Sequence, residues 1–127
     1  MKTTTRTQTN SRFNKSLNRN HGVLLKRLEV NNRTLEIRTT IHSLERFEYR
    51  GVDIKKSLKS ISRLGIYGLN RYAEEGIDLG IQDYNHNITT ILTFESDSED
   101  YIQIRVRTII GRPNAYLTPG TKRIVLK

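Results

Sequence analysis

In the segment around residues 35–38, apolar residues recur at every second position. Leu35 and Ile37 lie between polar neighbours, as in a strand with one buried face. The apolar-rich stretch 23–30 precedes this segment, and Asn31-Asn32 separates the two. Because an Asn pair tolerates the left-handed conformations of a tight turn, the pattern predicts a β-hairpin.

The apolar period changes at Ile41. Ile41, Leu44 and Phe47 recur every three residues, so they share one face of a helix. Thr40 can cap this helix, and Gly51 can end it. The pattern therefore predicts a short helix directly after the hairpin.

A second helix is expected over about residues 54–64, capped by Asp53 and ended by Gly65. Its apolar residues point to the core, and three cations recur at four-residue steps on a different face: Lys55, Lys59 and Arg63. The two segments predict a helical hairpin with an apolar side and a cationic side. The glycine-bounded segment 65–76 is compatible with a short helix or a loop.

The strand period returns from Ile77 to the C-terminus. Asn85-His86-Asn87 is a turn candidate, and the segment 122–127 can close the sheet as an edge strand. Strands and helices are grouped rather than alternating, which is typical of an α+β fold. We expect an N-terminal β-hairpin and a two-helix hairpin packed on a C-terminal antiparallel sheet of about four strands.

The length of 127 residues suits one small domain. Residues 1–20 carry five Lys and Arg and no acid, with few apolar residues. Such a segment buries too little area to offset its ordering entropy, so we expect a basic flexible tail at 1–20 and a single α+β domain at 21–127. The alternative is a basic arm that orders on nucleic acid or within an assembly.

The charge and the cysteine content restrict the classes of partner and the cellular compartment that we expect. The net charge is +9, the pI is about 10.1 and there is no cysteine. A strongly basic chain favours phosphate-rich partners or an anionic surface, but charge alone does not separate RNA, DNA, a membrane and an acidic protein. RNA is the first expectation among these partners, and an acidic protein is the other. The absence of cysteine and of a long apolar run fits a cytoplasmic protein without a membrane partner.

No metal or cofactor signature is present, so we expect neither. The three histidines, His21, His42 and His86, are far apart and lack ligand spacing. No phosphate-binding GxxxxGK[ST] motif occurs. Chemistry without a metal remains open: RNA supplies its own 2′-hydroxyl nucleophile, while the protein provides a base, an acid and cations.

His42 is the candidate acid–base group. Arg46 lies one helical turn later, so both side chains can address one phosphate near a helix N-terminus. Arg105 and Arg107 share one face of a strand and form the second candidate pair. Further candidates for nucleic-acid binding are Arg50, Lys55, Lys59, Arg63, Tyr116 and Thr118.

Structural explanations stand beside each candidate. His42 can be a partly buried side chain, and Glu45 or Glu48 can simply pair with Arg46 or with neighbouring cations. The two strand arginines can belong to an exposed face of alternating charges. Thr118 before Pro119 can be plain turn chemistry.

The stretch IHSLERFEYRGVDIKKSLKSI, residues 41–61, resembles the BrnT-like group of small toxins. This group lies within the wider set of barnase-, colicin- and RelE-like ribonuclease folds. The resemblance is carried by the His and Arg four apart, the Arg50-Gly51 step and the following helix. It implies helices packed on an antiparallel sheet, metal-independent cleavage of RNA and an antitoxin partner.

Carried over residue by residue, the resemblance matches His42 and Arg46 to helix residues at the cleft. Arg105 or Arg107 matches a basic residue on a central strand. The chain departs from the pattern in lacking a second evident acid–base histidine and in its additional N-terminal hairpin and tail.

Two functions from different classes follow. The first is a metal-independent endoribonuclease or toxin-like RNA-binding protein, carried by a phage or another mobile element. The alternative is a non-catalytic basic protein that binds nucleic acid or assembles with a virion or polymerase. A sequence-specific DNA regulator is a weaker third candidate, because the exposed face of the second helix is rich in Lys and poor in the Asn and Gln that read bases.

Overall fold

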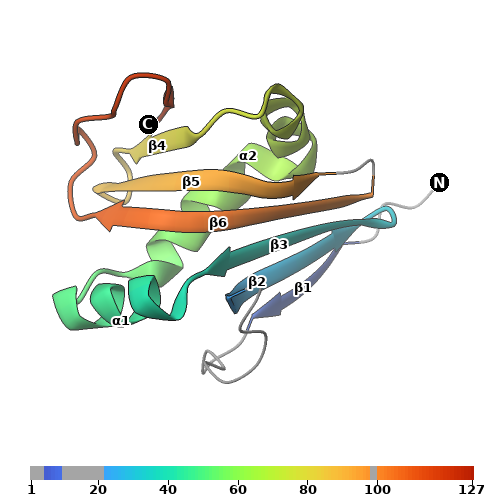
Figure 1. Cartoon of the computed structure of the whole chain (residues 1–127), viewed down its shortest axis with the longest axis horizontal. Coiled ribbons are helices and arrows are strands. Elements are labelled where there is room, and N and C mark those ends of the chain that lie inside the picture. Colours follow the sequence, from blue (N-terminus) through green and yellow to red (C-terminus); the bar gives the residue numbers. More distant parts are fainter. Residues whose placement is uncertain (1–4, 10–21, 98–99) are drawn as a thin grey trace.

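The computed structural model describes residues 5–9, 22–97 and 100–127, and these form one mixed sheet with two helices (Figure 1). Seven strands lie in the order β1-β2-β3-β6-β5-β4-β7. The elements along the chain are β1 (Thr5–Thr9), β2 (Val23–Val30), β3 (Arg33–Thr39), α1 (Ile41–Arg50), α2 (Ile54–Glu75), β4 (Leu79–Asp83), β5 (Ile88–Asp97), β6 (Tyr101–Ile110) and β7 (Lys122–Leu126).

The predicted hairpin is formed by β2 and β3. Asn31 and Asn32 turn the chain with φ angles of 50° and 65°, the left-handed conformation that this pair tolerates. β3 also pairs in parallel with β6, from Thr34 opposite Tyr101 to Arg38 opposite Arg105. The hairpin is therefore part of the main sheet.

The α+β class is confirmed, but the expected arrangement is wrong in two respects. The sheet has more than about four strands, and it is mixed because β3–β6 and β4–β7 are parallel. A hairpin packed on a separate sheet would leave the outer edge of β3 without backbone partners. Pairing with β6 satisfies those groups. Periodicity identifies strands but does not say which strands become neighbours.

α1 begins and ends where the sequence predicts. The Thr40 side chain accepts a hydrogen bond from the Ser43 amide at 2.9 Å, and Gly51 ends the helix with a φ of 68°. Leu44 and Phe47 are buried in the common core. The opposite side of α1 remains exposed because its apolar spacing covers one face.

α2 begins at the predicted cap and continues beyond the predicted end. The Asp53 carboxylate accepts a hydrogen bond from the Lys56 amide at 3.3 Å. At Gly65 the backbone leaves the helical region (φ 72°, ψ 161°), and the helix resumes to Glu75. It resumes because Ile66, Leu69 and Ala73 keep the helical spacing and are buried.

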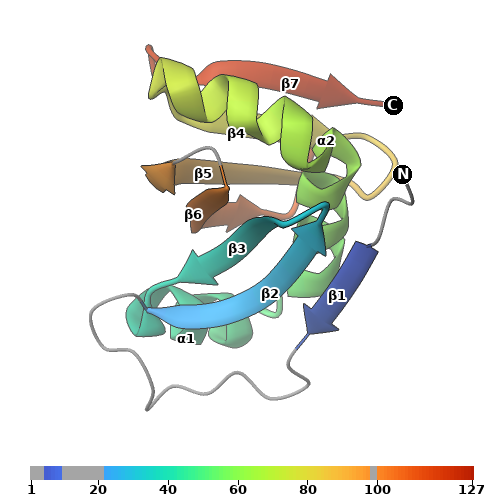
Figure 2. The same cartoon turned by 90° about the vertical axis from the view of Figure 1, so that its right-hand side faces the viewer.

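The helices and the sheet form two layers over a shared core. α2 lies across one face of the sheet and packs mainly against β5, while α1 lies near the end of β3 (Figures 1 and 2). On β6, Ile102, Ile104 and Val106 belong to this core. The loop after β6 covers part of the other sheet face, where Gln82 donates to the Ala115 carbonyl at 2.9 Å.

The segment predicted as a flexible tail, 1–20, contributes one described strand. β1 pairs antiparallel with β2, from Thr5 opposite Val30 to Thr9 opposite Lys26. Positions 1–4 and 10–20 of that prediction, and His21, lie outside the described residues. Within the described part of the chain, neither helix has the length and apolar character needed to cross a membrane.

Gly22 should be intolerant of substitution. Its φ is 77°, and a Cβ at this position would lie 2.3 Å from the Thr39 carbonyl oxygen. We expect Gly22→Ala to lower the free energy of unfolding by about 2 kcal/mol or more, measured by urea denaturation. Gly68 on α2 is the control because a Cβ there meets nothing within 4 Å. Gly68→Ala should be neutral or stabilising by about 0.5–1 kcal/mol. Equal effects of the two changes would contradict the packing described here.

Candidate nucleic-acid interface

The exposed side of α1 carries a hollow of about 350 Å³. Its lining consists of His42, Glu45, Arg46, Tyr49 and Arg50. These positions recur every three or four residues, so they form one stripe on the helix. All five residues are exposed, and Tyr49 is 92% exposed. The hollow is therefore lined by an imidazole, a carboxylate, two guanidinium groups and an aromatic ring, all in contact with solvent.

The charges around the hollow are not neutralised by one another. Among the described residues, neither Glu45 nor Arg46 has an ion-pair partner, although both line the hollow. The ring of His42 is open to solvent rather than packed in the core. Two structural explanations are therefore absent from the described residues: a half-buried His42 and an ion pair between Glu45 and Arg46.

The first half of α2 adds a cationic stripe. Lys55, Lys56, Lys59 and Arg63 are all exposed, and the helix has no acidic residue from Ile54 to Ala73. Lys55 and Lys56 lie in the first turn, where the helix dipole disfavours positive charge by about 0.3–1 kcal/mol. Helix stability does not explain their position. A bound anion would remove this unfavourable term.

Arg105 and Arg107 lie elsewhere. Strand alternation places them on the sheet side away from the core residues of β6, and neither lines the hollow. Arg105 pairs with Glu95 at 3.1 Å, and Arg107 pairs with Asp78 at 3.4 Å. The structure therefore brings His42, Arg46 and Arg50 together on α1, but it does not add the strand arginines to them.

Other arginines of the same sheet face are paired as well. Arg27 lies 2.9 Å from Glu29, and Arg38 lies 3.2 Å from Glu36. Tyr101 also donates a hydrogen bond to Glu36. Burial and this hydrogen bond raise the pKa of Tyr101 to about 12, so its hydroxyl remains a donor at neutral pH. Ion pairs between these arginines and neighbouring Glu or Asp residues therefore neutralise much of the positive charge on this face of the sheet.

Tyr116 and Thr118 lie in the loop between β6 and β7. The Thr118 hydroxyl lies 3.1 Å from the Thr121 hydroxyl, and the Thr118 carbonyl accepts from the Thr121 amide at 3.1 Å. These contacts form a turn. Tyr116 is 77% exposed, and neither residue lines the hollow on α1.

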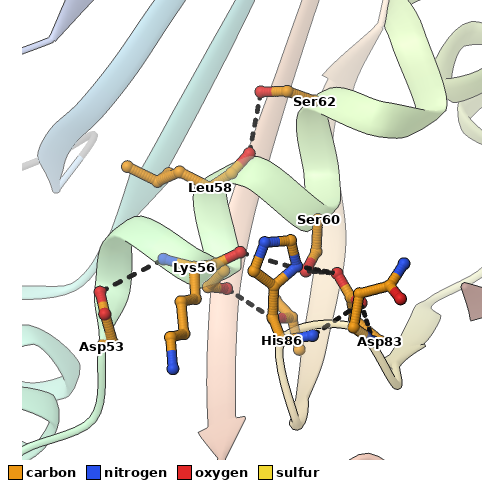
Figure 3. A network of polar contacts seen from close by, with 10 residues as sticks. Asp53, Lys56, Leu58, Ser60, Ser62, Asp83 and His86 are labelled. Carbon is orange, nitrogen blue, oxygen red and sulfur yellow. Dashed lines mark hydrogen bonds and ion pairs between the residues drawn. The ribbon is translucent and has the colours of Figure 1, made fainter. Parts of the chain in front are cut away.

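Asp83 is a buried polar residue that no sequence motif singled out. Its buried carboxylate accepts from Ser60 of α2 at 2.6 Å and from Nδ1 of His86 at 2.7 Å (Figure 3). It also accepts from the amides of Asn85 and His86. Ser60 and His86 both contact this carboxylate rather than each other, so the group ties a turn to a helix and does not form a nucleophilic triad.

The signal for Asp83 was present in the sequence, since Asp followed by a polar turn favours side-chain capping of backbone amides. What the sequence does not contain is the contact with Ser60, which requires α2 to cross β4. His86 is confirmed as a turn residue. Within the described residues, no group of three acidic or histidine side chains is arranged to hold a metal ion.

Comparisons with models of protein families, with curated proteins and with solved structures find no match for this chain.

Asp83 should make the fold sensitive to acid. Burial alone would raise the pKa of its carboxyl group, but hydrogen bonds from Ser60 and His86 outweigh burial and hold that pKa below the ordinary 3.8. A lowered pKa in the folded state contributes stability above the unfolded value, and this contribution is lost as pH falls through the folded value.

We therefore expect Asp83→Asn to cost about 1–3 kcal/mol at neutral pH, measured by urea unfolding. The difference from the wild type should shrink as the pH is lowered below 3.8. A difference that stays constant over this range, or grows in acid, would contradict the role of the charged carboxylate.

Proposed function

We propose that this protein binds single-stranded RNA through a helical surface formed by α1 and the first half of α2. The helical surface is defined by Arg46, Tyr49, Arg50, Lys55, Lys56, Lys59 and Arg63. One contrast carries the proposal. These six cations have no ion-pair partner among the described residues, whereas four arginines of the sheet, Arg27, Arg38, Arg105 and Arg107, each have one. Arg33 and Arg123, also in the sheet, have no ion-pair partner among the described residues.

Unpaired cations are the appropriate groups for a phosphate backbone. Each one that contacts a phosphate releases condensed counterions, which makes binding favourable at low salt. Placing several on one surface costs folding energy through mutual repulsion, and two of them also oppose the dipole of α2. A bound polyanion would reduce both the mutual repulsion and the unfavourable interaction with the helix dipole. The clustering of cations is therefore better explained by binding to a partner than by a contribution to folding stability.

Tyr49 supports a single-stranded partner. Its ring is almost fully exposed and lies beside Arg46 and Arg50 in the lining of the hollow. Exposed aromatic rings flanked by cations offer bases a stacking platform, and the bases must be unstacked to use it. The resemblance of residues 41–61 to BrnT-like ribonucleases adds support for RNA over DNA.

Cleavage of the bound RNA is the second candidate function, favoured by the composition of the hollow. His42 and Glu45 can supply an acid and a base, and Arg46 and Arg50 can neutralise the phosphorane. In this candidate reaction, cations of α1 take the phosphate-neutralising role that was expected for Arg105 and Arg107, since these two arginines are paired on the sheet. Binding ranks first because, among the described residues, no hydrogen bond joins the side chains that line the hollow, so they are not held in a fixed catalytic geometry.

Neutralising the helical surface should weaken RNA binding. We expect Lys59→Gln with Arg63→Gln to reduce affinity for a fluorescent single-stranded RNA, measured by anisotropy over a salt series. The plot of the logarithm of the binding constant against the logarithm of the salt concentration has a negative slope. The magnitude of this slope should decrease by about 0.7 for each lost phosphate contact.

The matched control is Lys122→Gln with Arg123→Gln on β7, which makes the same change in net charge. If both double variants lose affinity equally, total charge rather than the helical surface determines binding. Equal affinity for duplex DNA and single-stranded RNA would contradict the role of base stacking.

Removing the acid–base groups should abolish cleavage if the second candidate is correct. We expect His42→Ala and Glu45→Gln each to slow RNA cleavage by about 100-fold or more in the presence of EDTA. RNA affinity should change little, because the phosphate-binding cations are retained. Arg123→Gln serves as the control and should cleave like the wild type. An inactive wild type would leave binding as the function, and full activity of His42→Ala would show that His42 is not the acid–base group.

A further inference from the structure

β7 forms one edge of the sheet and presents a second, separate surface. It pairs in parallel with β4, from Leu79 opposite Lys122 to Asp83 opposite Leu126, and it is the last strand of the described sheet. Ile124 and Leu126 pack against the core, whereas Val125 is 43% exposed. The outer side of β7 therefore has no strand partner within the described part of the chain.

The hydrogen-bond pattern identifies the backbone groups that point outward. The Lys122 amide donates to the Asp78 carbonyl, and the Leu126 carbonyl accepts from the Tyr84 amide, both at 2.8 Å. In a parallel ladder, alternate residues direct both their amide and their carbonyl to the same neighbour. Lys122, Ile124 and Leu126 thus face β4. The amides and carbonyls of Arg123 and Val125 face the open edge.

The charge of this edge restricts what can bind there. Lys122, Arg123 and Lys127 are exposed, and the chain has no acidic residue from Tyr101 to Lys127. Pairing of β7 with β7 of a second copy would bring like charges together, which is unfavourable across a strand pair. Binding of an acidic strand is favourable by contrast, because the edge offers backbone hydrogen bonds and three cations attract the acidic side chains.

We propose that β7 binds an extended acidic peptide segment of a partner protein, which adds to the sheet as a further strand. The outward backbone groups of Arg123 and Val125 provide the hydrogen bonds. Arg123, Val125 and Lys127 share one face of β7, and the two cations select acidic residues on the same face of the peptide. The alternate, apolar residues of the peptide continue the face formed by Ile124 and Leu126. This surface is distinct from the helical surface and does not depend on RNA binding.

A proline at position 125 tests this assignment. Val125→Pro removes an amide that points to the open edge and places the proline ring in the path of an added strand, while the bonds to β4 remain. The probe is a capped, fluorescent peptide of alternating Glu and Val. We expect it to bind the wild-type chain and to bind Val125→Pro at least about tenfold more weakly.

Val125→Thr is the matched control, because it changes the same side chain but keeps the amide, and it should bind the probe like the wild type. Thermal unfolding and RNA binding should be alike for both variants. Arg123→Glu should weaken binding, and a Lys-Val peptide should not bind. Absence of binding to the wild type, or equal binding by the proline and threonine variants, overturns the proposal. A wild-type dimer that Val125→Pro dissociates would assign the edge to a second copy instead.

Discussion

The parallel pairing of β3 with β6 is the interaction on which the rest of the structure depends. It joins the N-terminal hairpin to the C-terminal strands and aligns Leu35 with Ile102 and Ile37 with Ile104. These residues are nearly or fully buried and form part of one core with α2. The same register aligns Glu36 with Gln103 and Arg38 with Arg105 on the other side. One pairing thus sets both the apolar face that α2 covers and the polar face that it leaves open.

This division explains the distribution of charge. On the polar face, acidic residues of neighbouring positions lie within reach of Arg27, Arg38 and Arg105, so these cations are paired. Within the described residues, no element covers the outer side of the helices, and α2 carries no acid before Glu74. Most of the exposed cations without an ion-pair partner in the described residues lie on the helical surface and along β7, and Arg71 and Arg112 lie elsewhere. These two surfaces underlie the two binding proposals.

The sequence predicted local features well because they depend on neighbouring residues. The turn at Asn31-Asn32, the cap of α1 by Thr40 and the cap of α2 by Asp53 follow from side-chain and backbone preferences over a few positions. The order of strands in the sheet could not be predicted, since periodicity does not encode which edges meet. The same limit affected the site: spacing on one helix correctly grouped His42 with Arg46, whereas grouping them with Arg105 required knowledge of β6's neighbours.

The central claim is that the unpaired cations of the helical surface are the groups that receive RNA. Backbone amide chemical shifts recorded by NMR during titration with a single-stranded RNA test it most directly, because they report each position separately. The account predicts saturable shifts in α1 and in the first three turns of α2, with little change on the arginine-paired strands β3 and β6. Shifts concentrated on those strands, or no shifts at any position, would contradict it.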